Sequence, residues 1–187
     1  MVEPRKLFGG LGNRLFQMAY IYGQMRRGII FDIYVQNPVY FEQYKDEIKQ
    51  WFGDGIREIN KVAVHVRRGA NPTVSTEPKY CENPFVVNLC ETDYYEKAMS
   101  LFPDEEFIIF TDDPDYCKAR WPNIEVREGQ SDIEDLNEMA SCKGVIMANS
   151  SFSWWGAFLS NGKVVAPKKY YADGIERTKY PKHWITI

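Results

Sequence analysis

Hydrophobic and polar positions along the chain follow two different periodicities. In residues 61–67 (KVAVHVR), valine occupies every second position, which is typical of a β-strand. Residues 13–27 instead carry apolar side chains three and four positions apart, and Gly28 follows them, so we expect a helix that stops there. Ser131 and Glu134 have the spacing of a capping box, which indicates the start of another helix.

The same criteria divide the rest of the chain into short strands and helices. We expect strands at 29–35, 61–67, 106–110, 124–128, 144–148 and 163–167, and helices at 13–27, 39–52, 92–102 (with Thr92 as its cap), 132–142 and 153–160. From residue 61 onward, strands alternate with helices of about ten residues, which predicts a mostly parallel sheet covered on both faces. The expected fold class is therefore α/β and Rossmann-like. Residues 68–91, which contain three prolines, are predicted to form a long irregular loop.

Composition places the chain among globular proteins, because 44% of its 187 residues are hydrophobic and 15% are aromatic. A net charge of −3, without a long run of either sign, argues against the broad basic face that nucleic-acid binding requires. No apolar run reaches the roughly 18 residues needed to cross a bilayer, and the first residues do not resemble a secretory leader. We therefore expect a cytoplasmic protein with no transmembrane segment and no nucleic-acid partner. The sequence indicates no particular oligomeric state.

The cysteines argue against a structural metal site. Cys81, Cys90, Cys117 and Cys142 contain no C-x-x-C pair, and only two histidines accompany them. Zinc sites in proteins usually need closer ligand spacing. We expect reduced thiols and no bound metal.

Polar side chains follow three of the predicted strands, at the point where each strand ends. The three sets are His65, Arg67 and Arg68; Thr111, Asp112 and Asp113; and Asn149, Ser150, Ser151 and Ser153. In a parallel sheet these ends meet at one edge, where ligands bind. The third set leads into a helix, whose free N–H groups and positive dipole end favour an anion such as phosphate. Because a neighbouring arginine can hold two phosphate oxygens at once, the sequence predicts a diphosphate site.

Each of these features also has an ordinary structural explanation. Serines before a helix commonly act as N-caps, and Trp154 and Trp155 are typical core residues. Paired arginines after a strand are often solvated, and His65 can be a half-buried residue that bonds to backbone. The two aspartates before Pro114 can form a turn.

The stretch GGLGNR (9–14) lacks the defining residues of a nucleotide-binding loop. Leu15 stands where G-x-G-x-x-G needs its third glycine, and no Lys-Ser/Thr pair follows as in a P-loop. We interpret the stretch as a tight turn that lets another group approach the backbone closely.

Five motifs, in this order, resemble those of the α-1,2-fucosyltransferases of glycosyltransferase family 11. They are GGLGNRLFQMA (9–19), HVRRG (65–69), FTDD (110–113), DLNEMASC (135–142) and NSSFSWWGAFL (149–159). The resemblance covers most of the chain. It implies a metal-independent, inverting transfer of L-fucose from GDP-fucose to a glycan acceptor, with a galactoside 2-hydroxyl as the expected position and no cofactor. It also implies a GT-B-like fold, with a reduced N-terminal acceptor-side lobe at 1–60 and a Rossmann-like GDP-sugar-binding domain at 61–187.

The resemblance also implies roles for individual residues. Arg67 would hold the diphosphate while His65 and Arg68 shape its loop, and these three are the catalytic candidates. Asp135 would accept hydrogen bonds from N1–H and the 2-amino group of guanine. The other candidates for binding GDP-fucose are Gly10, Asn13, Asp112, Asp113, Asn149, Ser150, Ser151 and Phe152. The arginine and helix N–H donors would stabilise the charge that grows on the β-phosphate as the fucose–oxygen bond breaks.

Two departures from the family pattern bear on activity. The pattern continues His-x-Arg-Arg-x-Asp, but Ala70 stands at the carboxylate position and is followed by Asn71. The segment before residue 61 is also shorter than usual. A catalytically weak or inactive GDP-sugar-binding protein is therefore an alternative. A third interpretation takes DDPD (112–115) as the D-x-D signature of a GT-A enzyme, which would bind manganese.

Overall fold

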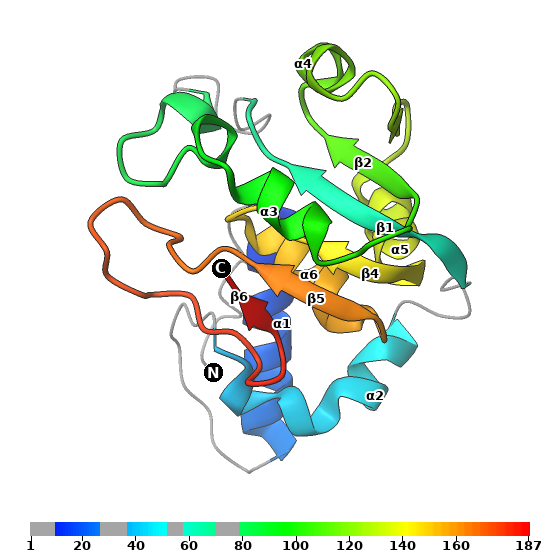
Figure 1. The fold of residues 1–187 in the computed structure, drawn as a ribbon. Helices are drawn as coiled ribbons and strands as arrows, with labels where there is room; N and C mark the ends of the chain where they lie inside the picture. Colours follow the sequence, from blue (N-terminus) through cyan, green and yellow to red (C-terminus); the bar gives the residue numbers. More distant parts are fainter. Residues whose placement is uncertain (1–9, 27–36, 52–57, 70–78) are drawn as a thin grey trace.

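The computed structural model describes residues 10–26, 37–51, 58–69 and 79–187. Within these ranges, six strands form one sheet in the order β3-β2-β1-β4-β5-β6, and every neighbouring pair is parallel (Figure 1). The strands are β1 (Ile59–Val66), β2 (Phe107–Thr111), β3 (Glu125–Val126), β4 (Cys142–Ile146), β5 (Lys163–Ala166) and β6 (Ile185–Thr186). This strand order is that of a doubly wound Rossmann-like sheet. The predicted α/β class is confirmed.

Helices pack on both faces of the sheet. They are α1 (Leu11–Arg26), α2 (Lys45–Lys49), α3 (Tyr94–Ser100), α4 (Pro114–Arg120), α5 (Asp132–Ser141) and α6 (Ser151–Leu159), and short 3₁₀ turns lie at η1 (Pro38–Tyr40), η2 (Glu42–Tyr44), η4 (Tyr80–Glu82) and η5 (Leu89–Glu91). Side chains alternate between the two faces of a strand. Ala63 of β1 therefore joins a core with α1, α5 and α6, whereas Val62 and Val64 join a second core with α3 and α4.

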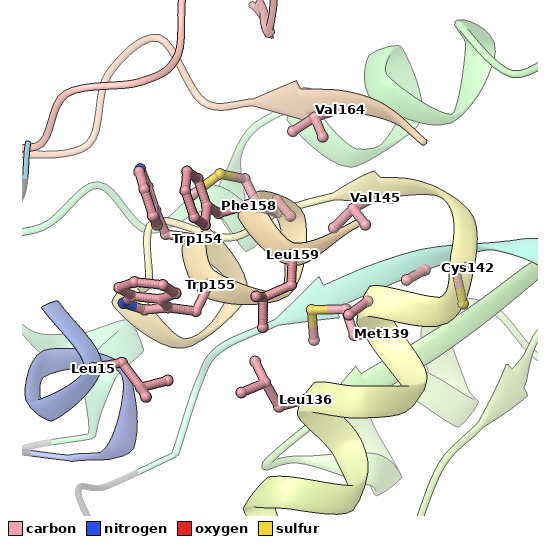
Figure 2. Packing of buried hydrophobic residues seen from close by; sticks show 14 of the residues in the cluster. Leu15, Leu136, Met139, Cys142, Val145, Trp154, Trp155, Phe158, Leu159 and Val164 are labelled. Carbon is pink, nitrogen blue, oxygen red and sulfur yellow. The ribbon is translucent and has the colours of Figure 1, made fainter. Parts of the chain in front are cut away.

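Aromatic side chains join the N-terminal residues to the sheet domain. Trp154 and Trp155 of α6 are fully buried, which fits their expected role as core residues. Phe16 of α1 lies 4.5 Å from Trp154, and Phe41 stacks on Trp155 at 5.5 Å between ring centroids. Figure 2 shows both tryptophans and Leu15 of α1 in this apolar cluster, with side chains of α5 on its other side. Side chains of residues 11–26 and 37–51 thus share a core with the sheet, and the proposed division at residue 60 stays a prediction.

Most predicted elements are confirmed, with ends that shift by at most two residues. Ser131 and Glu134 form the expected capping box of α5. The N-cap of α3 is Asp93 and not the expected Thr92, although the Thr92 hydroxyl accepts a hydrogen bond from the backbone N–H of Tyr94 at 3.2 Å. The strand predicted at 29–35 lies outside the described residues.

Up to residue 51, where this described segment ends, the helix predicted at 39–52 is replaced by 3₁₀ turns and the short α2. Phe41 interrupts the helical pattern with a φ of −145°, and its ring is fully buried against Trp155. Tertiary packing of this one ring therefore outweighs the local preference for a continuous helix. Helix α4 and the short β6 were not predicted. The signal for α4 is visible in retrospect, because Asp113 is a favourable N-cap and Pro114 a favourable first helical residue.

Candidate functional site

A cavity of about 570 Å³ lies at the carboxyl ends of the central strands. Helix α3, the next α-helix after β1, packs on one face of the sheet, and α6, which follows β4, packs on the opposite face. In doubly wound folds this divergence opens the crevice in which ligands bind. The walls of the cavity come from the first turn of α1, the ends of β1 and β2, the starts of α5 and α6, and two loops that contain Tyr80 and Tyr170.

The structure brings most of the predicted site residues to this cavity. Those that line it are Gly10, Asn13, His65, Arg67, Asp112, Asp135, Ser150, Ser151 and Phe152. Arg68, Asp113 and Asn149 are not among the lining residues. Arg67 and Ser151, from two different strand ends, therefore face the same space. The ligand roles themselves stay predictions.

Arg67 is held in place by contacts on two sides. Its guanidinium forms an ion pair with Asp112 at the end of β2, and the same carboxylate accepts a hydrogen bond from the backbone N–H of Arg68 at 2.8 Å. The guanidinium also lies over the ring of Tyr80, at 5.6 Å from the ring centroid. A side chain fixed in this way is oriented before any ligand arrives, which lowers the entropic cost of binding.

Arg68 and Asp113 have a structural role at the side of the cavity. Arg68 Nε donates to Asp113 Oδ2 at 3.0 Å, and its guanidinium stacks 3.6 Å from the ring centroid of Tyr116. The pKa of Asp113 is lowered, chiefly by the hydrogen bond from Arg68. Asp113 also accepts the backbone N–H of Tyr116 at 3.3 Å and so caps α4. Asp113, the first carboxylate of the D-x-D pattern Asp113-Pro114-Asp115, is thus already engaged by Arg68 and by the start of α4.

The start of α6 presents the serine run to the cavity. Ser150 is the N-cap of the helix and accepts the backbone N–H of Phe152 at 3.3 Å. Ser153 donates back to the carbonyls of Ala148 and Ser150, both at 3.3 Å, so its hydroxyl supports the turn. The ordinary capping role and the cavity-facing position therefore coexist in this run.

Asn149 holds two loops together. It is 2% exposed, and its Nδ2 donates to the carbonyl of Val87 at 2.7 Å and to that of Tyr170 at 3.1 Å. These carbonyls belong to the two loops that form one wall of the cavity, and the same loops are joined by an antiparallel bridge between Val86 and Tyr171. The amide of Asn149 is thus engaged in shaping the wall.

The glycine turn packs directly on the serine turn. A Cβ at Gly12 would lie 2.5 Å from the backbone carbon of Ser151 and 2.6 Å from the nitrogen of Phe152. The expected close approach at residues 9–14 is therefore confirmed, and the approaching group is the start of α6. Gly10, Asn13 and Arg14 consequently lie at the rim of the cavity.

His65 is buried beside Phe152, at 5.5 Å between ring centroids. Among the described residues, its Nδ1 has no hydrogen-bond partner. Burial lowers its pKa to about 4, and Arg67 acts in the same direction while Asp112 opposes it. The imidazole is therefore neutral at pH 7.

Asp135, near the start of α5, also lines the cavity. Burial raises its pKa to about 6, and the nearby Glu138 and Asp132 add to this effect. Within the described part of the chain, its Oδ1 is buried and accepts no hydrogen bond. A carboxylate oxygen in this situation suits a ligand that brings an N–H donor.

Several cavity residues were not predicted. They are Leu11, Gly12, Arg14, Gly69, Tyr80, Asn83, Val86, Phe110, Gln130, Asp132, Tyr170 and Tyr171, whereas Thr111 was expected at its strand end. Arg14 could have been found, because it ends the glycine stretch that was expected to approach another group. The tyrosines carried no local signal, since they come from irregular loops whose path depends on tertiary contacts.

Other features of the described residues bear on ligands and location. No three His, Cys, Asp or Glu side chains cluster there in a way that could hold a metal ion. All four cysteines are free thiols. Every described helix is too short or too polar to cross a lipid bilayer.

Comparisons with known proteins give one family. The family model described as "Glycosyl transferase family 11" matches residues 9–187. An Escherichia coli protein named alpha-1,2-colitosyltransferase is 30% identical over 199 residues, which cover 89% of this chain and 65% of that protein. The Escherichia coli protein named O-antigen biosynthesis glycosyltransferase WbnK is 31% identical over 144 residues, which cover 68% of this chain and 45% of that protein. The chain thus spans less than two thirds of either relative. No solved structure matches the chain.

Proposed function

Because the chain belongs to glycosyl transferase family 11, we propose that it transfers L-fucose from GDP-fucose to a sugar hydroxyl, with a galactoside 2-hydroxyl as the expected position. The observation that carries this proposal is one cavity lined by Arg67, by residues 150–152 and by Asp135. A cation and a helix N-terminus suit a diphosphate, and a carboxylate oxygen that accepts no other hydrogen bond suits the N–H groups of a nucleobase.

The diphosphate is assigned to the side of the cavity where β1 and β4 end. Arg67 supplies charged N–H donors, and the first turn of α6 adds backbone N–H groups and the positive end of its dipole. Arg14 at the rim brings a second positive charge to the same cavity. Together these groups can balance much of the negative charge of GDP.

The guanine ring of GDP is assigned to Asp135. Guanine offers two neighbouring donors, N1–H and the 2-amino group, and a carboxylate can accept both. Adenine lacks the 2-amino group and presents an acceptor at N1, so the same carboxylate disfavours it. This difference predicts a preference for GDP over ADP.

In the proposed reaction, the bond between C1 of fucose and the β-phosphate oxygen breaks, and its electron pair stays on GDP. The acceptor oxygen bonds to C1 from the opposite face, which inverts the anomeric centre, and its proton is released. Arg67 and the N–H groups of α6 stabilise the negative charge that develops on the departing β-phosphate. Ala70, which stands where the family has a carboxylate, lies outside the described residues, and we assign no general base.

Nucleotide selectivity and transfer provide the test. We expect GDP at about 100 times its Kd to stabilise the protein by about 2.7 kcal/mol, with much smaller effects of UDP and ADP at the same concentration. With GDP-fucose and a panel of galactosides, we expect a fucosylated product whose linkage can be assigned by NMR. Equal stabilisation by all three nucleotides would exclude Asp135 as the guanine reader.

Two other outcomes correspond to specific alternatives. One relative is named for colitose, which is fucose without its 3-hydroxyl, so GDP-colitose is the second candidate donor. A higher kcat/KM for GDP-colitose than for GDP-fucose would favour it. Binding of GDP-fucose with neither transfer nor hydrolysis would instead favour an inactive GDP-sugar-binding protein, as Ala70 suggests.

Metal independence is part of the same proposal. The ion pair of Asp113 with Arg68 supports it, because this first carboxylate of the D-x-D pattern (Asp113-Pro114-Asp115) already has a cationic partner. We expect activity to persist in EDTA. Loss of activity in EDTA with recovery on adding Mn²⁺ would instead support the D-x-D interpretation.

A further inference from the structure

Tyr80 begins the η4 turn and lies between two strand ends that both contribute to the cavity. Its backbone N–H donates to the carbonyl of Gly69 at 2.9 Å, and the N–H of Cys81 donates to the carbonyl of Arg68 at 3.2 Å. These two bonds fasten the η4 turn to the residues that follow β1. The backbone of Tyr80 is thus fixed next to Arg67.

The side chain of Tyr80 spans from Arg67 to the end of β4. Its ring lies under the Arg67 guanidinium, at 5.6 Å from Cζ to the ring centroid. Its hydroxyl donates a hydrogen bond to the backbone carbonyl of Asn149, the residue before the N-cap of α6. A single phenol therefore links the arginine and the serine turn that line the same cavity.

The chemistry of a phenol suits this position. An aromatic ring attracts a guanidinium by its face, while the N–H donors of the guanidinium point outward in its own plane. The contact with Tyr80 therefore restricts the direction of Arg67 without using the donors that an anion needs. The hydroxyl is anchored on a rigid residue, since Asn149 is buried and bonded to two loops.

We propose that Tyr80 is a positioning residue for the donor diphosphate, which keeps the Arg67 guanidinium and the start of α6 at the separation at which both can bind the same diphosphate. The ring orients Arg67, and the hydroxyl bonds Tyr80 to Asn149 at the start of α6. This inference rests on the proposed function, because it takes the diphosphate of GDP as the ligand that both groups hold.

Calorimetric titration with GDP tests the role through a double-mutant cycle. The proteins compared are wild type, Tyr80→Phe, Tyr80→Leu, Arg67→Ala and the double variant Tyr80→Leu/Arg67→Ala. We expect Tyr80→Leu to weaken GDP binding about tenfold, and Tyr80→Phe, which keeps the ring, to weaken it about two- to threefold. In the Arg67→Ala background we expect Tyr80→Leu to change the affinity less than twofold, because Tyr80 acts through that arginine.

Phe85→Leu is the matched control. Phe85 belongs to the same loop and is 75% exposed, and it is not among the cavity-lining residues. We expect it to bind GDP as wild type does. Melting temperatures identify any variant that fails to fold. If Tyr80→Leu unfolds, Tyr80→Phe still tests the hydroxyl bond to Asn149, and wild-type affinity in Tyr80→Phe would overturn that part of the role.

The outcomes separate this inference from the proposed function. Wild-type affinity in Tyr80→Leu, together with weakened binding in Arg67→Ala, would overturn the role of Tyr80 and leave the diphosphate site intact. Equal losses from Tyr80→Leu with and without Arg67 would show that Tyr80 does not act through it, and would also overturn the inference. Failure of the wild-type protein to bind GDP would overturn both the donor assignment and the role of Tyr80.

Discussion

Arg67 at the end of β1 and Asp112 at the end of β2 form an ion pair at the edge of the cavity. The pairing follows from the parallel register, in which Val66 of β1 lies opposite Thr111 of β2. Arg67 and Asp112 are the next residues along the chain, so they lie side by side. Asp112 also binds the backbone N–H of Arg68. One carboxylate thus orients both the side chain and the backbone of the turn that we assign to the diphosphate.

Replacing the arginine tests this assignment directly. We expect Arg67→Ala to weaken GDP binding by at least about tenfold, because a hydrogen bond to a charged group contributes about 1.5–3 kcal/mol. Lys97→Ala removes a positive charge from the exposed surface of α3 and should leave the affinity unchanged. Titration calorimetry measures both. An equal loss in the two variants would indicate a general charge effect.

Asp135→Asn tests the recognition of guanine through its pH dependence. The pKa of Asp135 is raised from 3.8 to about 6, so its carboxylate becomes protonated as pH falls through 6 and can then accept fewer hydrogen bonds from guanine. We expect GDP binding to weaken between pH 7.5 and pH 5 more steeply in wild type than in Asp135→Asn. The variant is the necessary control, because the terminal phosphate of GDP titrates in the same range.

The same shift in pKa makes a prediction about stability. Since folding raises the pKa of Asp135, the folded state binds a proton more tightly than the unfolded state, and the stability that this provides is lost as pH rises through 6. Asp135→Asn should therefore gain stability relative to wild type above pH 6. Chemical denaturation at pH 5 and pH 8 measures the free energies of unfolding of both proteins. The same difference between wild type and Asp135→Asn at both pH values would contradict the pKa shift.

Gly12→Ala tests the contact between α1 and α6. Its Cβ would fall 2.5 Å from a backbone atom of Ser151, so the two helices would have to separate. We expect a loss of about 1–3 kcal/mol in the free energy of unfolding, as for other overpacked sites. At Gly10 a Cβ would meet nothing within 4 Å, so Gly10→Ala should leave the melting temperature close to that of wild type.

Asn149→Ala tests the structural role of the buried amide. The substitution leaves the carbonyls of Val87 and Tyr170 without their Asn149 donor, and an unsatisfied buried group costs about 1–3 kcal/mol. We expect a clear loss of stability in urea denaturation. Faster hydrogen exchange in residues 79–91 and 167–180 would identify the loops that the amide holds. A variant as stable as wild type would contradict this role.

The sequence by itself determined the α/β class, most of the strands and the set of polar residues at strand ends. Alternating valines in β1 and the Ser131–Glu134 capping box of α5 are local patterns, and their physics operates within a few residues. The position of ligand groups after parallel strands was also predictable, since the carboxyl ends of parallel strands share one edge.

Tertiary structure alone decided which of these residues face the cavity. Arg67 and Arg68 are adjacent in the chain, yet one lies over Tyr80 in the cavity and the other stacks on Tyr116 outside it. Asn149 and Ser150 are also adjacent in the chain but differ in the same way. The amide of Asn149 is buried and bonded to a loop carbonyl, whereas Ser150 lines the cavity. Phe41 likewise breaks a predicted helix to reach Trp155. In each case the deciding contact is with a residue distant in sequence, which no local pattern encodes.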